Sequence, residues 1–296
     1  MQKEPDIIML QERILRGVGN RFRPNRTTEL FYRSCLPSNP HLILVMIHGA
    51  GQHSGQFLDL GTYCSGHNIA FYALDLRGFG QSQGKRGHVN SFREYLDDLD
   101  HFIDHVRTLH PDHPVFLLGH SLGGTIVVRY GQERQNGIRG AILSAPALKL
   151  RVRIPMSLFY ACCLLSWLIP GVCVELQRWG SRLARIPRFR SFFRGELSEK
   201  ADPLATTQFS VRWFTELLFN GNQALRKARD FEMAVLCLCG TDDQLIDPNA
   251  VQEFYDFLQV EDKKYMVFPG VRHRLLQDNT KELVYEQIVN WLKERS

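Results

Sequence analysis

The 296-residue sequence lacks the marks of several large protein classes. It has no internal repeat and no low-complexity segment, which argues against a solenoid or a disordered chain. It has no P-loop, and no G-x-G-x-x-G follows a strand, so we expect no cofactor. The net charge is only +5, and this gives no reason to expect nucleic acid as a partner.

Cysteine is scarce and follows no pattern. The seven cysteines are an odd number without metal-ligand spacing, so we predict no metal site and free thiols in a reducing compartment. The apolar run at residues 7–10 is too short for the core of a signal peptide and leads directly into charged residues. Together these observations predict a cytoplasmic protein.

Short apolar runs recur along the chain and alternate with helical patterns. Such runs, rich in Val, Ile, Leu and Phe, are typical of strands buried on both faces of a parallel sheet. The runs are residues 41–49, 68–78, 114–120, 140–146, 233–240 and 264–270. Residues 91–110 carry one apolar stripe at helical spacing, as does the last segment. The alternation predicts an α/β fold with a mostly parallel central sheet flanked by helices.

The alternation is interrupted once. Residues 147–230 are mostly helical in pattern and stand between the predicted strands at 140–146 and 233–240. We therefore interpret residues 1–296 as a single domain with a helical cap, or lid, inserted at 147–230. The first 40 residues are harder to interpret and are compatible with leading antiparallel strands.

The motif GHSLGG at residues 119–124 contains the strongest candidate for a catalytic residue. It follows the strand PVFLL directly and precedes a helical pattern. A serine within G-x-S-x-G on such a turn is held in a strained conformation at the edge of the sheet. We predict that Ser121 is a nucleophile.

A serine nucleophile needs a histidine base and an acid that orients the base, and in this architecture both follow the serine in the chain. His273 is the only histidine beyond Ser121, and it lies in a loop after the predicted strand at 264–270. The loop after the strand at 233–240 offers three acids, Asp242, Asp243 and Asp247. We favour Asp243, because Asp247 precedes a proline and is placed to cap a helix.

The oxyanion of an acyl-transfer reaction requires hydrogen-bond donors. One donor is predicted to be the backbone N–H of Leu122, which follows the nucleophile. The other is expected from the glycine-rich loop HGAGQHSGQF, where the Ala50 N–H is the best candidate. His48 is expected to brace this loop.

These stretches together resemble the α/β-hydrolase superfamily. Within it, the chain is similar to the monoacylglycerol lipase and lysophospholipase branch, which has a serine aminopeptidase-like domain. The matching stretches are HGAGQHSGQF, LDLRGFGQSQGKRG, GHSLGG, CGTDDQLID and PGVRH. The resemblance implies an α/β-hydrolase fold, a triad of Ser121, Asp243 and His273, and oxyanion amides at Ala50 and Leu122. It further implies structural roles for Asp75, Arg77 and Ser82, whereas Gln52 stands where many relatives carry an acid.

The stretch IPMSLFYACCLLSWLIPGVCV, at 154–174, has no charged side chain. A helix between its two prolines is only about 21 Å long, against about 30 Å of hydrocarbon. A span here would also separate Ser121 from His273. We interpret the stretch as a lid helix that contacts the acyl chain or a membrane surface; a buried cap helix is the alternative. The candidate contacts are Leu158, Phe159, Leu164, Leu165, Trp167 and Leu168.

Six arginines mixed with aromatic residues follow at 178–194. This composition favours an anionic headgroup surface, with a solvated basic face of the cap as the alternative. We therefore predict a serine esterase that cleaves lipid esters with one acyl chain, with peripheral contact to anionic membranes. The alternatives are a peptidase or thioesterase that uses the same triad, and a non-catalytic binding protein on a hydrolase scaffold.

Overall fold

A computed structural model describes residues 17–134, 137–152, 154–175 and 202–296. Its centre is an eight-stranded sheet with the order β1-β2-β4-β3-β5-β6-β9-β10. The strands are β1 Val18–Phe22, β2 Leu30–Cys35, β3 Leu42–Ile47, β4 Ile69–Leu74, β5 Val115–His120, β6 Ile138–Ser144, β9 Ala234–Gly240 and β10 Lys263–Phe268. Each apolar run in the sequence forms a strand, and only β3 and β4 are more than one residue shorter than their runs.

The sheet is parallel from β4 to β10 and antiparallel at its other edge. β2 pairs antiparallel with both β1 and β4, whereas the pairs from β4 through β3, β5, β6 and β9 to β10 are all parallel. Every residue of β3, β4 and β5 is buried, as expected for parallel strands covered on both faces. The predicted mostly parallel α/β fold is confirmed.

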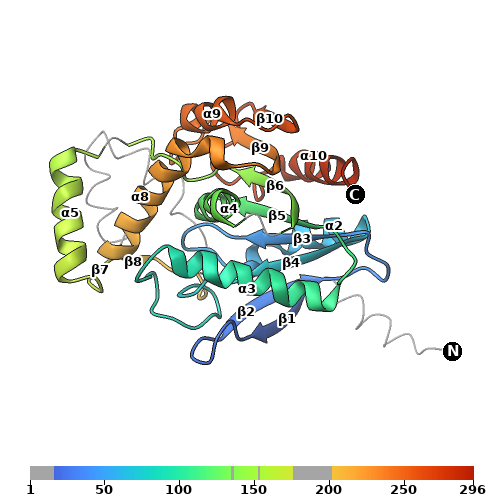
Figure 1. Cartoon of the computed structure of the whole chain (residues 1–296), viewed down its shortest axis with the longest axis horizontal. Coiled ribbons are helices and arrows are strands. Elements are labelled where there is room, and N and C mark those ends of the chain that lie inside the picture. Colours follow the sequence, from blue (N-terminus) through green and yellow to red (C-terminus); the bar gives the residue numbers. More distant parts are fainter. Residues whose placement is uncertain (1–16, 135–136, 153, 176–201) are drawn as a thin grey trace.

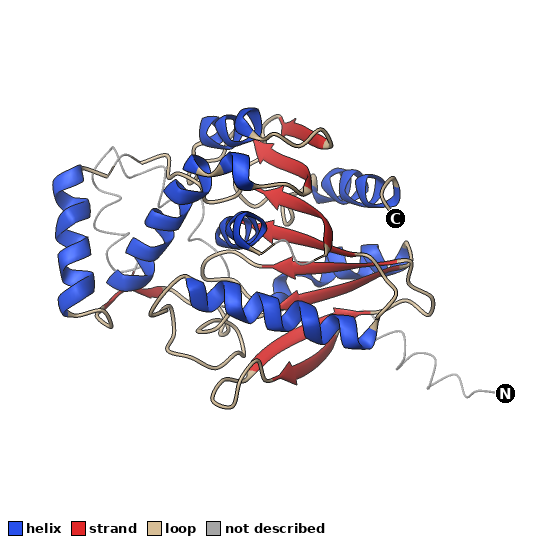
Figure 2. Ribbon diagram, in the orientation of Figure 1, coloured by secondary structure: helices blue, strands red, loops and turns tan. Residues whose placement is uncertain are grey.

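Helices cover both faces of the sheet (Figure 2). They are η1 Ser54–Phe57, α2 Leu58–Gly66, α3 Arg93–Leu109, α4 Leu122–Glu133, η2 Ala228–Asp230, α9 Pro248–Phe257 and α10 Lys281–Lys293. Apolar side chains of α3, α4 and α9 belong to the hydrophobic core on one face. Those of α2 and α10 belong to the core on the other face. The sheet is thus packed between two separate apolar layers, one on each face.

Between β6 and β9, the described residues form four further elements besides η2. They are α5 Met156–Leu168, β7 Cys173–Glu175, β8 Gln208–Ser210 and α8 Val211–Arg226. β7 and β8 form a small antiparallel pair of their own. Figure 1 shows α5 at the left edge of the molecule, with α8 between it and the central sheet. Helical elements therefore interrupt the strand alternation where the sequence predicts a cap.

Candidate active site

Ser121 lies on the turn between β5 and α4. Its backbone has φ 54° and ψ −115°, a conformation that residues other than glycine rarely adopt. A Cβ atom at Gly119 would lie 2.3 Å from the carbonyl oxygen of Gly123, and one at Gly123 would lie 2.0 Å from that of Ile47. Both distances are far inside van der Waals contact. The turn can therefore close only with glycine at these two positions, and it carries the strained serine that the motif predicts.

Ser121, His273 and Asp243 form one hydrogen-bonded chain. The Oγ atom of Ser121 lies 2.9 Å from Nε2 of His273, and Nδ1 of His273 lies 2.7 Å from Oδ2 of Asp243. Because a carboxylate can only accept, Nδ1 carries the ring proton and Nε2 is left to accept from the serine hydroxyl. All three residues are buried. The structure thus brings together three residues that the sequence separates widely.

The carboxylate of Asp243 is fixed by more than the histidine. Its second oxygen accepts two backbone N–H groups of the following turn at 2.8 and 2.9 Å. Asp247 caps α9 by accepting a backbone N–H of the first turn, and Asp242 is exposed beside a threonine hydroxyl. Of the three acids that the sequence offers, Asp243 is the one that contacts His273.

The Ala50 and Leu122 amides belong to residues next to Gly49 and Ser121, and neither has a hydrogen-bond partner in the described part of the chain. Leu122 is the first residue of α4, where a helix cannot satisfy its own N–H groups. Gly49, next to Ala50, approaches the serine so closely that a Cβ there would lie 3.1 Å from Ser121 Cβ. Both amides are therefore available to a ligand atom near Ser121.

His48 braces the loop that carries Ala50, as expected. Its Nδ1–H donates to the Gly49 carbonyl at 2.7 Å, and its Nε2 accepts the Leu76 N–H at 3.0 Å. Complete burial lowers the pKa of His48 to about 4, although Asp75 nearby acts in the opposite direction. The imidazole is thus neutral and ties the end of β3 to the end of β4.

A second buried histidine, His120, directly precedes the nucleophile. Burial and the neighbouring His273 hold the pKa of His120 well below its ordinary value. Its ring centre lies 5.0 Å from that of His273, and its Nδ1 lies 3.2 Å from the carbonyl oxygen of Ser144. His120 therefore packs against the catalytic candidate as an uncharged ring.

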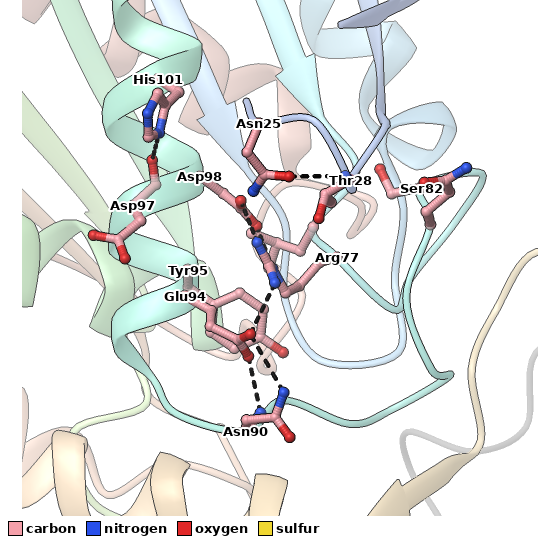
Figure 3. A network of polar contacts seen from close by, with 12 residues as sticks. Asn25, Thr28, Arg77, Ser82, Asn90, Glu94, Tyr95, Asp97, Asp98 and His101 are labelled. Carbon is pink, nitrogen blue, oxygen red and sulfur yellow. Dashed lines mark hydrogen bonds and ion pairs between the residues drawn. The ribbon is translucent and has the colours of Figure 1, made fainter. Parts of the chain in front are cut away.

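The loop after β4 is held by polar contacts below the site. The Asp75 carboxylate accepts two backbone N–H groups, and Ser82 donates its hydroxyl proton to the Asp75 carbonyl. Figure 3 shows the Arg77 guanidinium between Asp98 and Glu94 of α3, with two bonds of 2.6 Å to Asp98. The structural roles expected for Asp75, Arg77 and Ser82 agree with these contacts.

Hydrogen bonds that the sequence does not predict join Asp202, within the predicted cap, to the loop that carries Ala50. Asp202 lies 2.8 Å from His53 Nε2 and 2.9 Å from Gln56 Nε2. Partial burial acts to raise the pKa of Asp202, but these bonds and one from a backbone amide outweigh burial and lower that pKa to about 2. Four residues later, the Thr206 N–H donates to the Gly51 carbonyl at 3.0 Å. No local motif marks Asp202, because its partners lie about 150 residues earlier in the chain.

The apolar stretch forms the helix α5, and the surface of this helix is mostly exposed. Only Ser166 of this helix is buried, whereas Leu158, Leu164 and Trp167 are exposed by 53, 58 and 73%. The alternative of a buried cap helix is therefore wrong. Among the described residues, no helix is both long enough and apolar enough to cross a membrane. The arginine-rich stretch at 178–194 lies outside the described residues.

A mostly parallel sheet that presents a serine on such a turn, followed in the chain by an acid and a histidine, defines the α/β-hydrolase class of serine hydrolases. Within that class, the chain belongs to the serine aminopeptidase S33 family, whose family model matches residues 38–280. The resemblance predicted from the motifs is therefore confirmed.

Similar proteins narrow the class further. Phospholipase YtpA of Bacillus subtilis is 31% identical over 249 residues, which are 83% of this chain and 93% of that protein. The monoacylglycerol lipase of Mycolicibacterium smegmatis is 27% identical over 256 residues, which are 86% of this chain and 89% of that protein. The crystal structure of Paleococcus ferrophilus monoacylglycerol lipase has a TM-score of 0.76 and 29% identity, and covers 90% of this chain and 99% of that one. The predicted enzyme class, a serine ester hydrolase, is confirmed.

Proposed function

We propose that this protein hydrolyses the carboxylic ester of lipids with one acyl chain, a monoacylglycerol or a lysophospholipid, through an acyl-enzyme on Ser121. The observation that carries the proposal is the continuous contact from Ser121 Oγ through the His273 ring to the Asp243 carboxylate. The activities in the names of the similar proteins, phospholipase and monoacylglycerol lipase, support the choice of substrate class.

The geometry accounts for both halves of the reaction. Ser121 Oγ attacks the acyl carbon while its proton passes to His273 Nε2, and Asp243 stabilises the imidazolium that results. The carbonyl oxygen becomes an oxyanion that accepts the Ala50 and Leu122 amides. When the tetrahedral species collapses, His273 returns the proton to the departing alcohol. A water molecule then repeats the sequence on the acyl-enzyme, and the fatty acid leaves with the serine restored.

The decisive variant is Ser121→Ala. It should lower kcat for a monoacylglycerol or a lysophospholipid by roughly 10⁴-fold or more. Labelling by a fluorophosphonate should also disappear, because the nucleophilic oxygen is gone. Ser65→Ala is the matched control and should keep full activity, because Ser65 lies in α2, on the face of the sheet opposite α4. Full turnover by Ser121→Ala would refute the mechanism.

A peptidase or thioesterase would use the same three residues, so the substrate must be tested separately. p-Nitrophenyl esters of increasing chain length, an acyl thioester and aminoacyl anilides form a suitable panel. The exposed apolar helix α5 favours esters of long acyl chains. Faster turnover of the anilides or of the thioester than of every ester would contradict the proposed substrate.

We further propose that α5 binds a lipid surface. Leu164 and Leu168 lie one helical turn apart on the same face, and both are more than half exposed. Burial of one such side chain in lipid contributes about 1.5–3 kcal/mol, so the two together favour binding strongly. No charged residue interrupts α5. Contact of this helix with the membrane would place the cap at the surface where lipid esters are found.

Liposome flotation tests whether α5 binds a lipid surface. The double variant Leu164→Ser and Leu168→Ser should reduce the recovered fraction at least tenfold, while kcat for a short soluble ester is kept. Leu283→Ser is the control, because Leu283 is equally exposed but lies on α10. Anionic and neutral vesicles should be compared, and stronger recovery with anionic vesicles is expected. Equal recovery of wild type and double variant would refute the contact.

A further inference from the structure

The Gln52 side chain closes the turn that presents the Ala50 amide. Its Oε1 accepts the Gly49 N–H at 2.8 Å, and its own backbone N–H donates to the Gly49 carbonyl at 3.2 Å. A Cβ atom at Gly49 would lie 2.7 Å from Gln52 Oε1 and 3.1 Å from Ser121 Cβ. The Gln52 amide and the nucleophile therefore pack against the same glycine. Gln52 is only 4% exposed, so its side-chain amide depends on hydrogen-bond partners within the protein.

The other end of the Gln52 amide reaches the loop that carries His273. Gln52 Nε2 donates to Gln277 Oε1 at 3.1 Å, and Gln277 Nε2 donates to the Gln56 carbonyl at 3.3 Å. Gln277 is four residues beyond His273, and its backbone N–H donates to the Arg274 carbonyl within the same compact loop. Two side-chain amides thus join the loop of the oxyanion donor to the loop of the base.

The hydrogen bonds of this bridge all run in one direction. Gly49 N–H donates to Gln52, Gln52 donates to Gln277, and Gln277 donates to Gln56. Reversing the Gln52 amide would set its NH₂ against the Gly49 N–H, donor against donor. The orientation is therefore fixed by the backbone, and each amide must both donate and accept.

We propose that Gln52 and Gln277 are positioning residues for ester hydrolysis, which hold the Ala50 amide and His273 at the spacing that the transition state requires. This inference rests on the proposed function. Among the described residues, the side-chain amides hydrogen-bond to Gly49, to each other and to Gln56 and not to the triad, so the pair acts through the two loops that it connects. A catalytic donor that moves by a fraction of an ångström loses much of its effect on the rate.

The bridge predicts that a carboxylate cannot replace either amide alone. Gln52→Glu keeps the acceptor for the Gly49 N–H but removes the donor to Gln277. If Gln277 turned to donate to the new carboxylate, its oxygen would face the Gln56 carbonyl, acceptor against acceptor. Adding Gln277→Lys supplies an ammonium that can donate both to the new carboxylate at position 52 and to the Gln56 carbonyl. The double variant should therefore recover what the single variant loses.

Steady-state kinetics with a p-nitrophenyl ester distinguish positioning from a purely structural role. Gln52→Glu and Gln277→Ala should each lower kcat about 5- to 10-fold, the effect of one neutral hydrogen bond, with KM changed less than about twofold. Gln52→Glu combined with Gln277→Lys should return kcat to within about threefold of wild type. Gln132→Glu is the control, because Gln132 also bridges two elements through its amide, between α4 and the end of α8; its kcat should be unchanged.

Three results would overturn the inference: an unchanged kcat in Gln277→Ala, a rise in KM alone, or no recovery in the double variant. If Gln52→Glu does not fold, as judged by circular dichroism, Gln277→Ala still decides, since Gln277 is half-buried and its removal leaves the bond between Gln52 and Gly49 intact. Failure of the proposed function would be seen differently, as turnover that survives Ser121→Ala.

Discussion

Acid should destabilise this protein through His48, well before most carboxylates are protonated. The ring is fully enclosed and neutral, with Nδ1–H donating to Gly49 and Nε2 accepting from Leu76. A proton on Nε2 would confront the Leu76 N–H with a second donor. Burial, the main cause, therefore lowers the pKa of His48 from 6.5 to about 4 in the folded chain.

The sign and size of the effect follow from proton linkage. Between pH 6.5 and 4 the unfolded chain binds a proton at His48 that the folded chain does not, so the free energy of unfolding falls as pH falls. For pKa values of 6.5 and about 4, the loss between pH 7 and pH 5 is about 2 kcal/mol. His120, whose pKa is also lowered by burial, adds to the loss in the same direction.

Urea unfolding at several pH values between 7 and 5 measures the loss. His48→Gln should be less stable than wild type at pH 7, but its free energy of unfolding should fall by about 2 kcal/mol less over this range. Contributions of His120 and of the carboxylates are common to both proteins and cancel in the difference. His101→Gln removes an exposed imidazole and should follow the wild-type curve. Parallel curves for wild type and His48→Gln would refute the reasoning.

Two further substitutions test the framework of the site. Asp98→Ala leaves the Arg77 guanidinium without its buried partner (Figure 3) and should cost roughly 3–5 kcal/mol in urea unfolding; Asp104→Ala, an exposed acid, should cost less than about 1 kcal/mol. Gly123→Ala places a Cβ 2.0 Å from the Ile47 oxygen and should lower the thermal midpoint and abolish fluorophosphonate labelling. Gly66→Ala, where nothing lies within 4 Å, should do neither, and a normal midpoint for Gly123→Ala would contradict the close approach.

The sheet and the three triad candidates could be predicted because they leave local sequence patterns or follow a fixed order along the chain. Buried parallel strands are continuous apolar runs, and β3, β4 and β5 are such runs. The turn at Ser121 requires glycine at fixed spacing, so the motif itself describes the geometry. His273 followed from chain order together with its place in a loop after a predicted strand, since no other histidine comes after the serine.

The supports of the site could not be predicted, because they join residues that no pattern relates. The amides of Gln52 and Gln277 are 225 positions apart, and Asp202 is 149 positions from His53. The residues that flank each of them in the sequence form no motif that points to its partner. Their roles appear only when the loops are placed side by side. The small β7–β8 pair in the cap was missed for a related reason, because three-residue strands leave too short a pattern.

Strand order places His273 several strands away from the strand that precedes Ser121. Ser121 follows β5, and the Ala50 loop follows β3, the adjacent strand. His273 follows β10, the edge strand, which is three strand spacings from β5 and four from β3. At about 4.8 Å per strand, its loop must reach back roughly 14 Å to the serine and 19 Å to the Ala50 loop. The start of that loop is joined to the loop after β9, because the Asp242 N–H donates to the Val271 carbonyl at 3.1 Å.

The far end of the loop is fixed by Gln277. Besides the Tyr285 hydroxyl, which donates to the Leu276 carbonyl at 2.7 Å, the bonds of Gln277 to Gln52 and Gln56 hold the segment after His273 on the side of β3. The His273 ring itself is held by the Asp243 carboxylate at Nδ1, by Ser121 Oγ at Nε2 and by the neighbouring His120 ring. We expect the anchor on the side of β3 to keep this ring against the strand ends that precede Ala50 and Ser121. Under the proposed mechanism, a base that follows the edge strand gains from a contact on the opposite side of the serine, and here a pair of neutral amides supplies it.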